Sequence, residues 1–301
     1  MSNPKRPFEQ PGRSGHWGFL WLACSFFCSS AFSQAWSASL NDVTAIPHIN
    51  SAGQEGYRAF LAAEPHRAFA IAPGGAWAWS AEQDNPDAAR EQAINTCQQH
   101  TQQRCVAYAV GNQVVFDARR WAQGWRPYAT KAQAHRAPLG TQRGQRFPNL
   151  RLTSPQGQPV NLSSLKGKVV VLHFWGSWCP SCRHELPQFS QLQKDFAKDA
   201  ATQRDLVFIT TQVRESAETA RTYLRQQGLP LALHDSGVTG GKNVHFLTAS
   251  GEKLPDRNIA PVFPATFVLD RHGIVVFSLR GSAADWRQYT PLLKDLLSAQ
   301  R

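Results

Sequence analysis

"KVVVLHFWGSWCPSC", residues 168–182, joins an apolar segment directly to two cysteines that lie three positions apart. Residues 169–175 are almost all apolar, which is typical of a strand buried on both faces of a sheet. Pro180 follows the first cysteine and suits the first turn of a helix, where its missing N–H costs no hydrogen bond. The stretch therefore predicts a buried central strand that leads at once into a helix, with Cys179 at the junction.

Strand and helix patterns continue to alternate after this stretch. "DLVFITT" (205–211) predicts a second buried strand, and "SAETARTYLRQQG" (216–228) predicts a helix with a serine cap and a glycine stop. "ATFVLD" (265–270) and "IVVFSLR" (274–280) flank a short turn and predict an antiparallel hairpin. "ADWRQYTPLLKDLL" (284–297) predicts an amphipathic helix. A parallel pair with a crossover helix, then a hairpin and a last helix, is the arrangement of the thioredoxin fold: an α/β fold with a central mixed sheet flanked by helices.

The junction between strand and helix gives the two cysteines different chemistry. Helix N–H groups and the positive end of the helix dipole point toward the sulfur of Cys179, which favours its thiolate and lowers the thiol pKa. Cys182 lies on the same side of the first turn but deeper, where it can attack a mixed disulfide. We therefore expect Cys179 to be the attacking nucleophile and Cys182 to be the resolving cysteine.

Two other uses of a cysteine pair fit less well. A structural zinc site needs four ligands, and His173 and His184 do not supply the missing two at an ordinary spacing. A structural disulfide across two intervening residues would be strained and labile. The pattern favours redox exchange, and no metal site is predicted.

Two longer stretches carry a resemblance to a known family. "LSSLKGKVVVLHFWGSWCPSCRHELP" (162–187) and "VFPATFVLDRHG" (262–273) are similar to motifs of the TlpA/ResA-like (DsbE/CcmG-type) exported thioredoxin-fold thiol–disulfide oxidoreductases. The resemblance covers residues from about 144 to 298. It implies a periplasmic enzyme that reduces disulfides in exported proteins and is re-reduced by a membrane thiol reductant of the DsbD/CcdA kind. It suggests apocytochrome c as a client, and it implies no nucleotide, flavin or metal cofactor.

The resemblance also assigns roles to individual residues. Pro264 matches the family's cis-proline, which packs against the cysteine pair and leaves the backbone of Phe263 free to pair with a substrate strand. Glu185 matches a glutamate that tunes the thiols or moves a proton; the alternative is an ordinary exposed glutamate on a helix surface. Trp178 and Pro180, on either side of Cys179, are further candidates for substrate contact.

One position departs from the family pattern. His173 stands where cytosolic thioredoxins have aspartate and where this family often has asparagine. A buried histidine there either assists proton transfer or bonds to the backbone, and the structural role is the favoured interpretation.

Two other functions stay open from the sequence. A disulfide oxidase or isomerase would use the same exchange in the other direction, because the direction depends on a reduction potential that the sequence does not reveal. A periplasmic binding protein, with its front half as the working part, is the alternative outside the enzyme class.

Residues 56–116 predict a small α+β domain of unknown function. Turn signals at residues 73–75 and 111–112 predict two hairpins, and a helix is expected to start at Pro86. Cys97 would end this helix and Cys105 would open the next strand, so a structural disulfide between them is predicted. The segment resembles a small secreted bacterial domain with a cysteine pair.

A basic stretch separates the two halves. The formal net charge is +11, and seven Lys and Arg residues with no acidic residue among them lie between positions 119 and 146. No helical or strand period is visible there, and no nucleic-acid-binding fold accompanies the charge. We expect a solvated basic linker over 117–143, a thioredoxin-like domain over 144–301, and no nucleic-acid partner.

The first 35 residues predict a signal peptide. Basic residues precede an apolar run at 17–32, which is too short and interrupted for a membrane span, and Ser33 and Ala35 have the spacing that signal peptidase accepts. Cleavage after Ala35 is expected. Retention as a membrane anchor and acylation at Cys24 are the alternatives.

Overall fold

The computed structural model describes residues 38–241 and 244–299. The predicted signal peptide lies outside these residues. Within the described ranges, every helix is too short or too polar to span a membrane.

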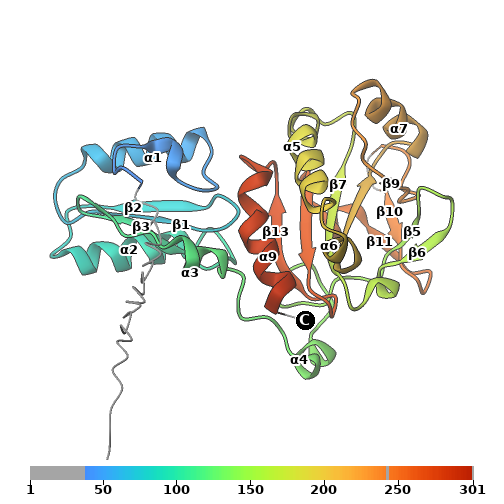
Figure 1. Cartoon of the computed structure of the whole chain (residues 1–301), viewed down its shortest axis with the longest axis horizontal. Helices are drawn as coiled ribbons and strands as arrows, with labels where there is room; N and C mark the ends of the chain where they lie inside the picture. Colours follow the sequence, from blue (N-terminus) through green and yellow to red (C-terminus); the bar gives the residue numbers. More distant parts are fainter. Residues whose placement is uncertain (1–37, 242–243, 300–301) are drawn as a thin grey trace, which may run out of the picture. The chain divides into compact units, whose positions relative to one another are not determined.

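The N-terminal part of the described chain is a four-stranded antiparallel sheet between two helices (Figure 1). Its elements are, in order, η1 (Val43–Ala45), α1 (Ser51–Ala62), β1 (Ala68–Ile71), β2 (Trp77–Ser80), α2 (Pro86–Gln98), β3 (Val106–Val110) and β4 (Gln113–Val114), with strand order β2-β1-β3-β4. Alternate side chains of β1 point to opposite faces. Phe69 and Ile71 pack with Tyr57 and Phe60 of α1, whereas Ala68 and Ala70 pack against α2.

The sequence predicted most of this part. Both hairpins form, and the side chain of Asn85 caps α2 by accepting from the N–H of Ala88. A disulfide joins Cys97, at the end of α2, to Cys105, just before β3. Helix α1 was not predicted, because it contains two glycines. Both lie against Trp77, and a Cβ at Gly56 would come within 2.2 Å of that ring.

The Cys97–Cys105 bond should stabilise this part without contributing to redox chemistry. Replacing both cysteines by alanine should lower the free energy of unfolding by about 2–3 kcal/mol, because the unfolded chain regains the freedom of the closed loop. Mild reduction of the wild type should open the Cys179–Cys182 bond first. Denaturant titration and peptide mapping after graded reduction test both statements. A Cys97–Cys179 linkage in the map would contradict them.

The basic stretch differs from the prediction. Residues 118–122 and 131–136 form short helices, α3 (Ala118–Ala122) and α4 (Lys131–Arg136), and a capping box at Thr130 starts the second. Trp125 is fully buried and stacks on Phe277 at 5.1 Å. No period was visible here because helices this short show none, although their caps are visible in the sequence, and the buried Trp125 shows that the stretch is not solvated throughout.

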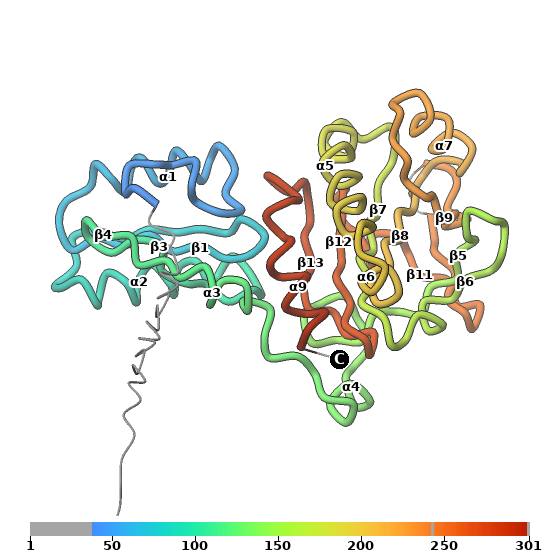
Figure 2. The backbone as a smooth tube through the Cα atoms, in the orientation of Figure 1, coloured from blue at the N-terminus to red at the C-terminus, as the bar shows by residue number. Residues whose placement is uncertain are grey.

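The C-terminal part has the predicted thioredoxin fold, with a five-stranded mixed sheet in the order β13-β12-β7-β8-β9 (Figure 2). The strands of this sheet are β7 (Val169–Trp175), β8 (Leu206–Gln212), β9 (Leu233–His234), β12 (Ala265–Leu269) and β13 (Val275–Arg280). β7, β8 and β9 are parallel, whereas β12 and β13 run antiparallel to their neighbours. The remaining elements are β5 (Arg151–Thr153), β6 (Pro159–Asn161), η2 (Leu162–Leu165), α5 (Pro180–Phe196), α6 (Ala200–Asp205), α7 (Ala217–Gln226), β10 (His245–Leu247), β11 (Lys253–Pro255), α8 (Asp256–Ile259), η3 (Trp286–Tyr289) and α9 (Thr290–Ala299).

The central strand β7 is buried on both faces, as predicted. Val171 and Trp175 pack with the apolar side chains of α5 and α9 on one face, whereas Leu172 and Phe174 belong to the core on the other face. His173 shares the face of Val171 and Trp175, because side chains alternate along a strand. It therefore points toward α5, the helix that carries the cysteines.

The described residues belong to one compact unit, in which the two parts of the chain touch directly. The ring of His48, in the N-terminal part, lies 4.1 Å from the ring of Tyr289, and its backbone N–H donates to the side chain of Gln288. Arg126 makes an ion pair with Asp295 of α9. The division into domains at 56–116, 117–143 and 144–301 stays a prediction.

Candidate redox active site

Cys179 caps the N-terminus of α5, four residues after the end of β7. It forms a disulfide with Cys182, and its Sγ lies 3.2 Å from the N–H of that residue. Cys179 is 4% exposed and Cys182 is fully buried. This is the predicted order of depth, with the helix N–H groups directed at the outer sulfur.

The peptide bond between Phe263 and Pro264 is cis, as the resemblance implies. It lies just before β12, and the Oγ of Ser181 is 3.5 Å from the carbonyl oxygen of Phe263. The first turn of α5 and the cis-proline loop are therefore neighbours. On its other side, the carbonyl of Pro264 accepts from the N–H of Gly281, after β13.

Exposed apolar side chains surround the disulfide. Trp178 is 45% exposed and Val262 is 51% exposed, in a protein that buries most of its large apolar side chains. The rings of Trp178 and Phe263 meet edge to face at 5.7 Å, and Pro180 is exposed next to them. Exposed apolar patches of this kind commonly mark interaction sites.

Arg214 supports the rim, and no pattern in the sequence pointed to it. Its guanidinium lies 5.9 Å from the ring centre of Trp178 and 5.1 Å from that of Phe263. Its Nε donates to the carboxylate of Asp256 at 2.6 Å, and Asp256 is only 1% exposed. Its backbone has φ +64°, in the left-handed region. The ion pair thus fixes a cation beneath both aromatic rings.

Replacing Arg214 by alanine should lower the free energy of unfolding by about 3–5 kcal/mol, because it leaves the carboxylate of Asp256 buried without its partner. The double variant Arg214→Met, Asp256→Leu should lose much less, because it removes both charges. Denaturant unfolding of the two variants measures the difference. Equal losses would show that packing, and not the ion pair, carries the effect.

The loop before Cys179 is tied to the end of β8. The backbone N–H of Ser177 donates to the carboxylate of Glu215 at 2.6 Å, and the Ser177 hydroxyl donates to the same group. The indole N–H of Trp178 donates to the carbonyl of Val213 at 2.9 Å. These bonds hold the loop before Cys179 in one conformation.

Glu185 lies one turn after Cys182 on α5 and is 1% exposed, so it is not an ordinary surface glutamate. Its Oε2 accepts from the backbone N–H of Ala283 at 2.8 Å and from the indole N–H of Trp286 at 3.0 Å. Burial nevertheless raises the pKa of Glu185 to about 8, since these two bonds only partly offset the loss of water. The carboxyl group is therefore mostly protonated at neutral pH.

His173 faces the other oxygen of Glu185. Its Nε2 lies 3.6 Å from Oε1, and its Nδ1 lies 2.8 Å from the hydroxyl of Thr266. The ring is fully buried against Phe189, and burial lowers the pKa of His173 to about 3. The pair is therefore neutral at pH 7, with one exchangeable proton on the carboxyl group beside an imidazole nitrogen.

The site contains most of the residues that the sequence singled out. The cysteines, Glu185 and the cis-proline loop lie on adjoining elements, with Trp178 and Pro180 at the rim. Cys97 and Cys105 belong to the N-terminal part. Over residues 38–241 and 244–299, no three His, Cys, Asp or Glu side chains are grouped closely enough to hold a metal ion.

Comparison with known proteins finds relatives of the C-terminal half. Residues 143–278 match the model of the AhpC/TSA family. The thioredoxin-like protein YneN of Bacillus subtilis is 28% identical over 154 residues, which are 50% of this chain and 78% of that protein. The thiol–disulfide oxidoreductase ResA of the same organism is 26% identical over 142 residues, or 47% of this chain and 69% of its own length.

Among solved structures, a protein described as a putative thiol:disulfide interchange protein DsbE from Chlorobium tepidum is similar at 22% identity and a TM-score of 0.39. The match covers 54% of this chain and all of that one. The sequence relatives together with the sheet topology confirm the resemblance drawn from the motifs. The C-terminal half is a thioredoxin-fold domain related to the TlpA/ResA-like proteins.

Proposed function

We propose that this thiol–disulfide oxidoreductase works in the reducing direction on disulfides of exported proteins. The observation that carries the proposal is the placement of Cys179 at a helix N-terminus, with Cys182 buried behind it and an apolar rim around both. Such a helix end favours a thiolate on the outer cysteine, and a reductase needs that thiolate as its nucleophile.

The reduced enzyme passes two electrons to its client in two exchange steps. The Cys179 thiolate attacks one sulfur of the client disulfide, so that a mixed disulfide forms and the other client sulfur leaves as a thiolate. Cys182, once deprotonated, attacks the Sγ of Cys179. The second client sulfur then leaves, and the Cys179–Cys182 bond closes. The client gains two protons and two electrons, and the enzyme is left oxidised.

Glu185 is the group placed to handle the proton of Cys182. The two residues are three positions apart on α5, so their side chains share one face of the helix. A carboxyl group with a pKa near 8 exchanges protons readily at neutral pH. Glu185 accepts the thiol proton when ionised, and His173 holds its side chain in place.

The client is expected to approach the rim in an extended conformation. Phe263 precedes a residue that has no N–H, and its backbone adjoins the first turn of α5. A client strand would pair with this backbone while its apolar side chains contact Trp178 and Pro180.

Location and electron supply follow from the same proposal. The predicted signal at residues 1–35 would deliver the protein to the periplasm, with the mature chain starting near Trp36. An enzyme that reduces clients in an oxidising compartment must be re-reduced, and a membrane thiol reductant of the DsbD/CcdA kind would do so. Mass measurement of protein purified from its host tests the start; a lipid on Cys24 would contradict it.

The proposed activity is tested with protein whose Cys179–Cys182 pair has been reduced beforehand. Mixed with an excess of a disulfide-bonded peptide, it should yield one reduced peptide for each enzyme molecule, read by alkylation and mass. If the peptide stays oxidised while a reduced dithiol peptide becomes oxidised by the disulfide form of the enzyme, the enzyme is an oxidase.

A further inference from the structure

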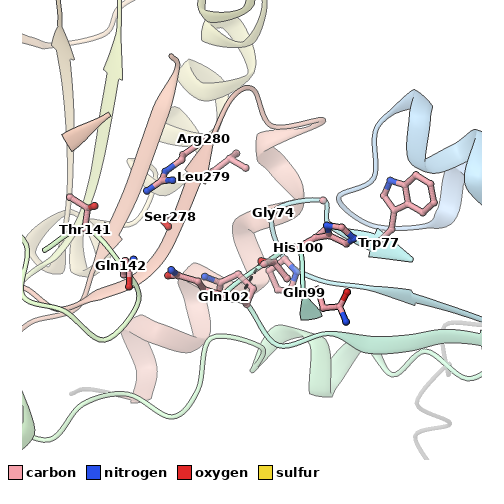
Figure 3. A pocket seen from close by; sticks show the side chains of 15 residues that line it. Gly74, Trp77, Gln99, His100, Gln102, Thr141, Gln142, Ser278, Leu279 and Arg280 are labelled. Carbon is pink, nitrogen blue, oxygen red and sulfur yellow. Dashed lines mark hydrogen bonds between the residues drawn. The ribbon is translucent and has the colours of Figure 1, made fainter. Parts of the chain in front are cut away.

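A polar cleft of about 810 Å³ lies beside the edge strand of the thioredoxin sheet. One wall consists of Ser278, Leu279 and Arg280 of β13, and residues 73–77 and 99–103 form the opposite side (Figure 3). The backbone N–H of Arg143 donates to the side chain of Gln102 at 2.9 Å. This hydrogen bond joins the loop at residues 99–103 to the segment around Arg143. A cavity of this volume has room for a short stretch of extended chain.

The backbone of β13 is free along this cleft. The N–H of Gly281 donates to the carbonyl of Pro264 and so points toward β12. Along β13, the backbone groups of successive residues point alternately toward β12 and away from it. The N–H and C=O groups of Arg280 and Ser278 therefore point away from β12. Earlier in β13, Val275 exchanges hydrogen bonds with residues 144 and 145, but no such partner pairs with Ser278 or Arg280 within the described part of the chain.

The cleft carries positive charge without a counter-charge. Its charged lining residue is the exposed Arg280, and none of its lining residues is acidic. Among the described residues, the guanidinium of Arg280 forms neither a hydrogen bond nor an ion pair. Charged side chains often guard an exposed sheet edge, but an arginine at an edge also selects an acidic partner.

We propose that an extended segment of the client protein, carrying an acidic side chain, adds to the free edge of β13 in this cleft. Its backbone would pair with Ser278 and Arg280, and its carboxylate would meet the guanidinium of Arg280. This deepens the proposed function, because the edge is a second contact beyond the rim around the disulfide. The contact at the edge of β13 would select clients by the sequence near their cysteines.

The edge lies within reach of the redox pair. Arg280 is paired with Ala265, the residue after the cis-proline, so the cleft starts at the same end of the sheet as Cys179. Only β12 separates β13 from β7, and two strand spacings amount to about 10 Å. When a client segment binds to this edge, a client disulfide a few residues along the chain can therefore reach Cys179.

The test uses the full-length oxidised protein and short capped peptides without cysteine, so that binding is measured apart from redox exchange. One peptide alternates valine and glutamate, and its matched partner has lysine in place of glutamate. The glutamate peptide should bind in a fluorescence anisotropy titration, and the lysine peptide should bind at least about tenfold more weakly. Binding should slow hydrogen exchange at the N–H groups of Ser278 and Arg280.

Two variants locate the contact. Arg280→Glu should weaken the glutamate peptide at least about tenfold and reverse the preference between the two peptides. Arg204→Glu makes the same change at an exposed arginine of α6 and should leave both affinities unchanged. A glutamate peptide methylated on the nitrogens that face the edge should not bind, because it has lost the donors that pair with β13.

Three results would overturn the proposal. Equal effects of the two variants would mean general charge attraction. Hydrogen exchange at Ser278 and Arg280 could also slow as the protein concentration rises, without any peptide. That result would mean that a second copy of the chain binds the edge. Absence of peptide binding, while the disulfide reduction assay still succeeds, would remove the edge contact and leave the proposed function intact.

Discussion

Replacing Cys182 by alanine should trap the protein as a covalent complex with its client on a non-reducing gel, whereas replacing Cys179 by alanine should trap nothing. Cys179 caps α5 and is the only residue of the pair with any exposure, at 4% against 0% for Cys182. The first exchange step needs only the outer thiolate, and the second needs only the buried one. Without the resolving cysteine the reaction therefore stops at the mixed disulfide.

Turnover should not separate the two variants. Both variants should lose at least about a thousandfold in catalytic disulfide reduction, because each lacks a group that forms and breaks covalent bonds. Only the complex on the gel distinguishes them, and reductant should release it. If Cys179→Ala trapped the client instead, Cys179 would not be the nucleophile. Loss of activity with intact client binding in Cys179→Ser would support the enzyme, whereas the absence of any phenotype would favour a binding protein.

Glu185→Gln should bind clients normally and slow the resolution step about a hundredfold, because an amide cannot accept a proton from Cys182. In the wild type, the rate of resolution should rise with pH as Glu185 ionises and level off above about pH 8. The variant should lack this inflection. Stopped-flow measurement of the decay of a mixed disulfide across pH 8 measures both effects.

The same substitution should change the dependence of stability on pH. Burial raises the pKa of Glu185 from 4.5 to about 8, so the folded state keeps a proton that the unfolded chain releases. Its contribution to stability is fully present below pH 4.5 and is lost as pH rises to about 8. The loss is on the order of 4–5 kcal/mol. Glutamine, which resembles the protonated group, avoids it.

The stability of Glu185→Gln relative to the wild type should therefore increase from pH 5 to pH 8. Glu252→Gln changes an exposed glutamate and serves as the control, with no such trend. A constant difference between Glu185→Gln and the wild type over this range would show that Glu185 is already ionised, and the proton-transfer role would fall with it.

The thioredoxin half could be predicted from the sequence because its patterns are local. A strand buried on both faces is a run of apolar residues, and Ser216 and Gly228 mark the ends of a helix by their own chemistry. The position of Cys179 between strand and helix then predicts its role as the nucleophile. The cis-proline and Glu185 came from the family resemblance and not from any pattern in the residues themselves.

Contacts between distant segments were not predictable. Arg214 forms an ion pair with Asp256, 42 residues later, and the sequence around either residue does not indicate this contact. Helix α1 was likewise missed because glycine disfavours a helix. Gly56 is needed there because the ring of Trp77 leaves no space for a Cβ. His173 was interpreted as structural, and only the fold reveals that its ring faces the carboxyl group of Glu185.

In the proposed function, the Cys179–Cys182 pair donates electrons to client disulfides. The most direct test is its reduction potential, measured by equilibration with glutathione and mass analysis of the alkylated peptide that contains both cysteines. We expect a value between about −200 and −270 mV, in the range of glutaredoxins and thioredoxin. A value near −120 mV, that of a strong oxidant such as DsbA, would contradict it.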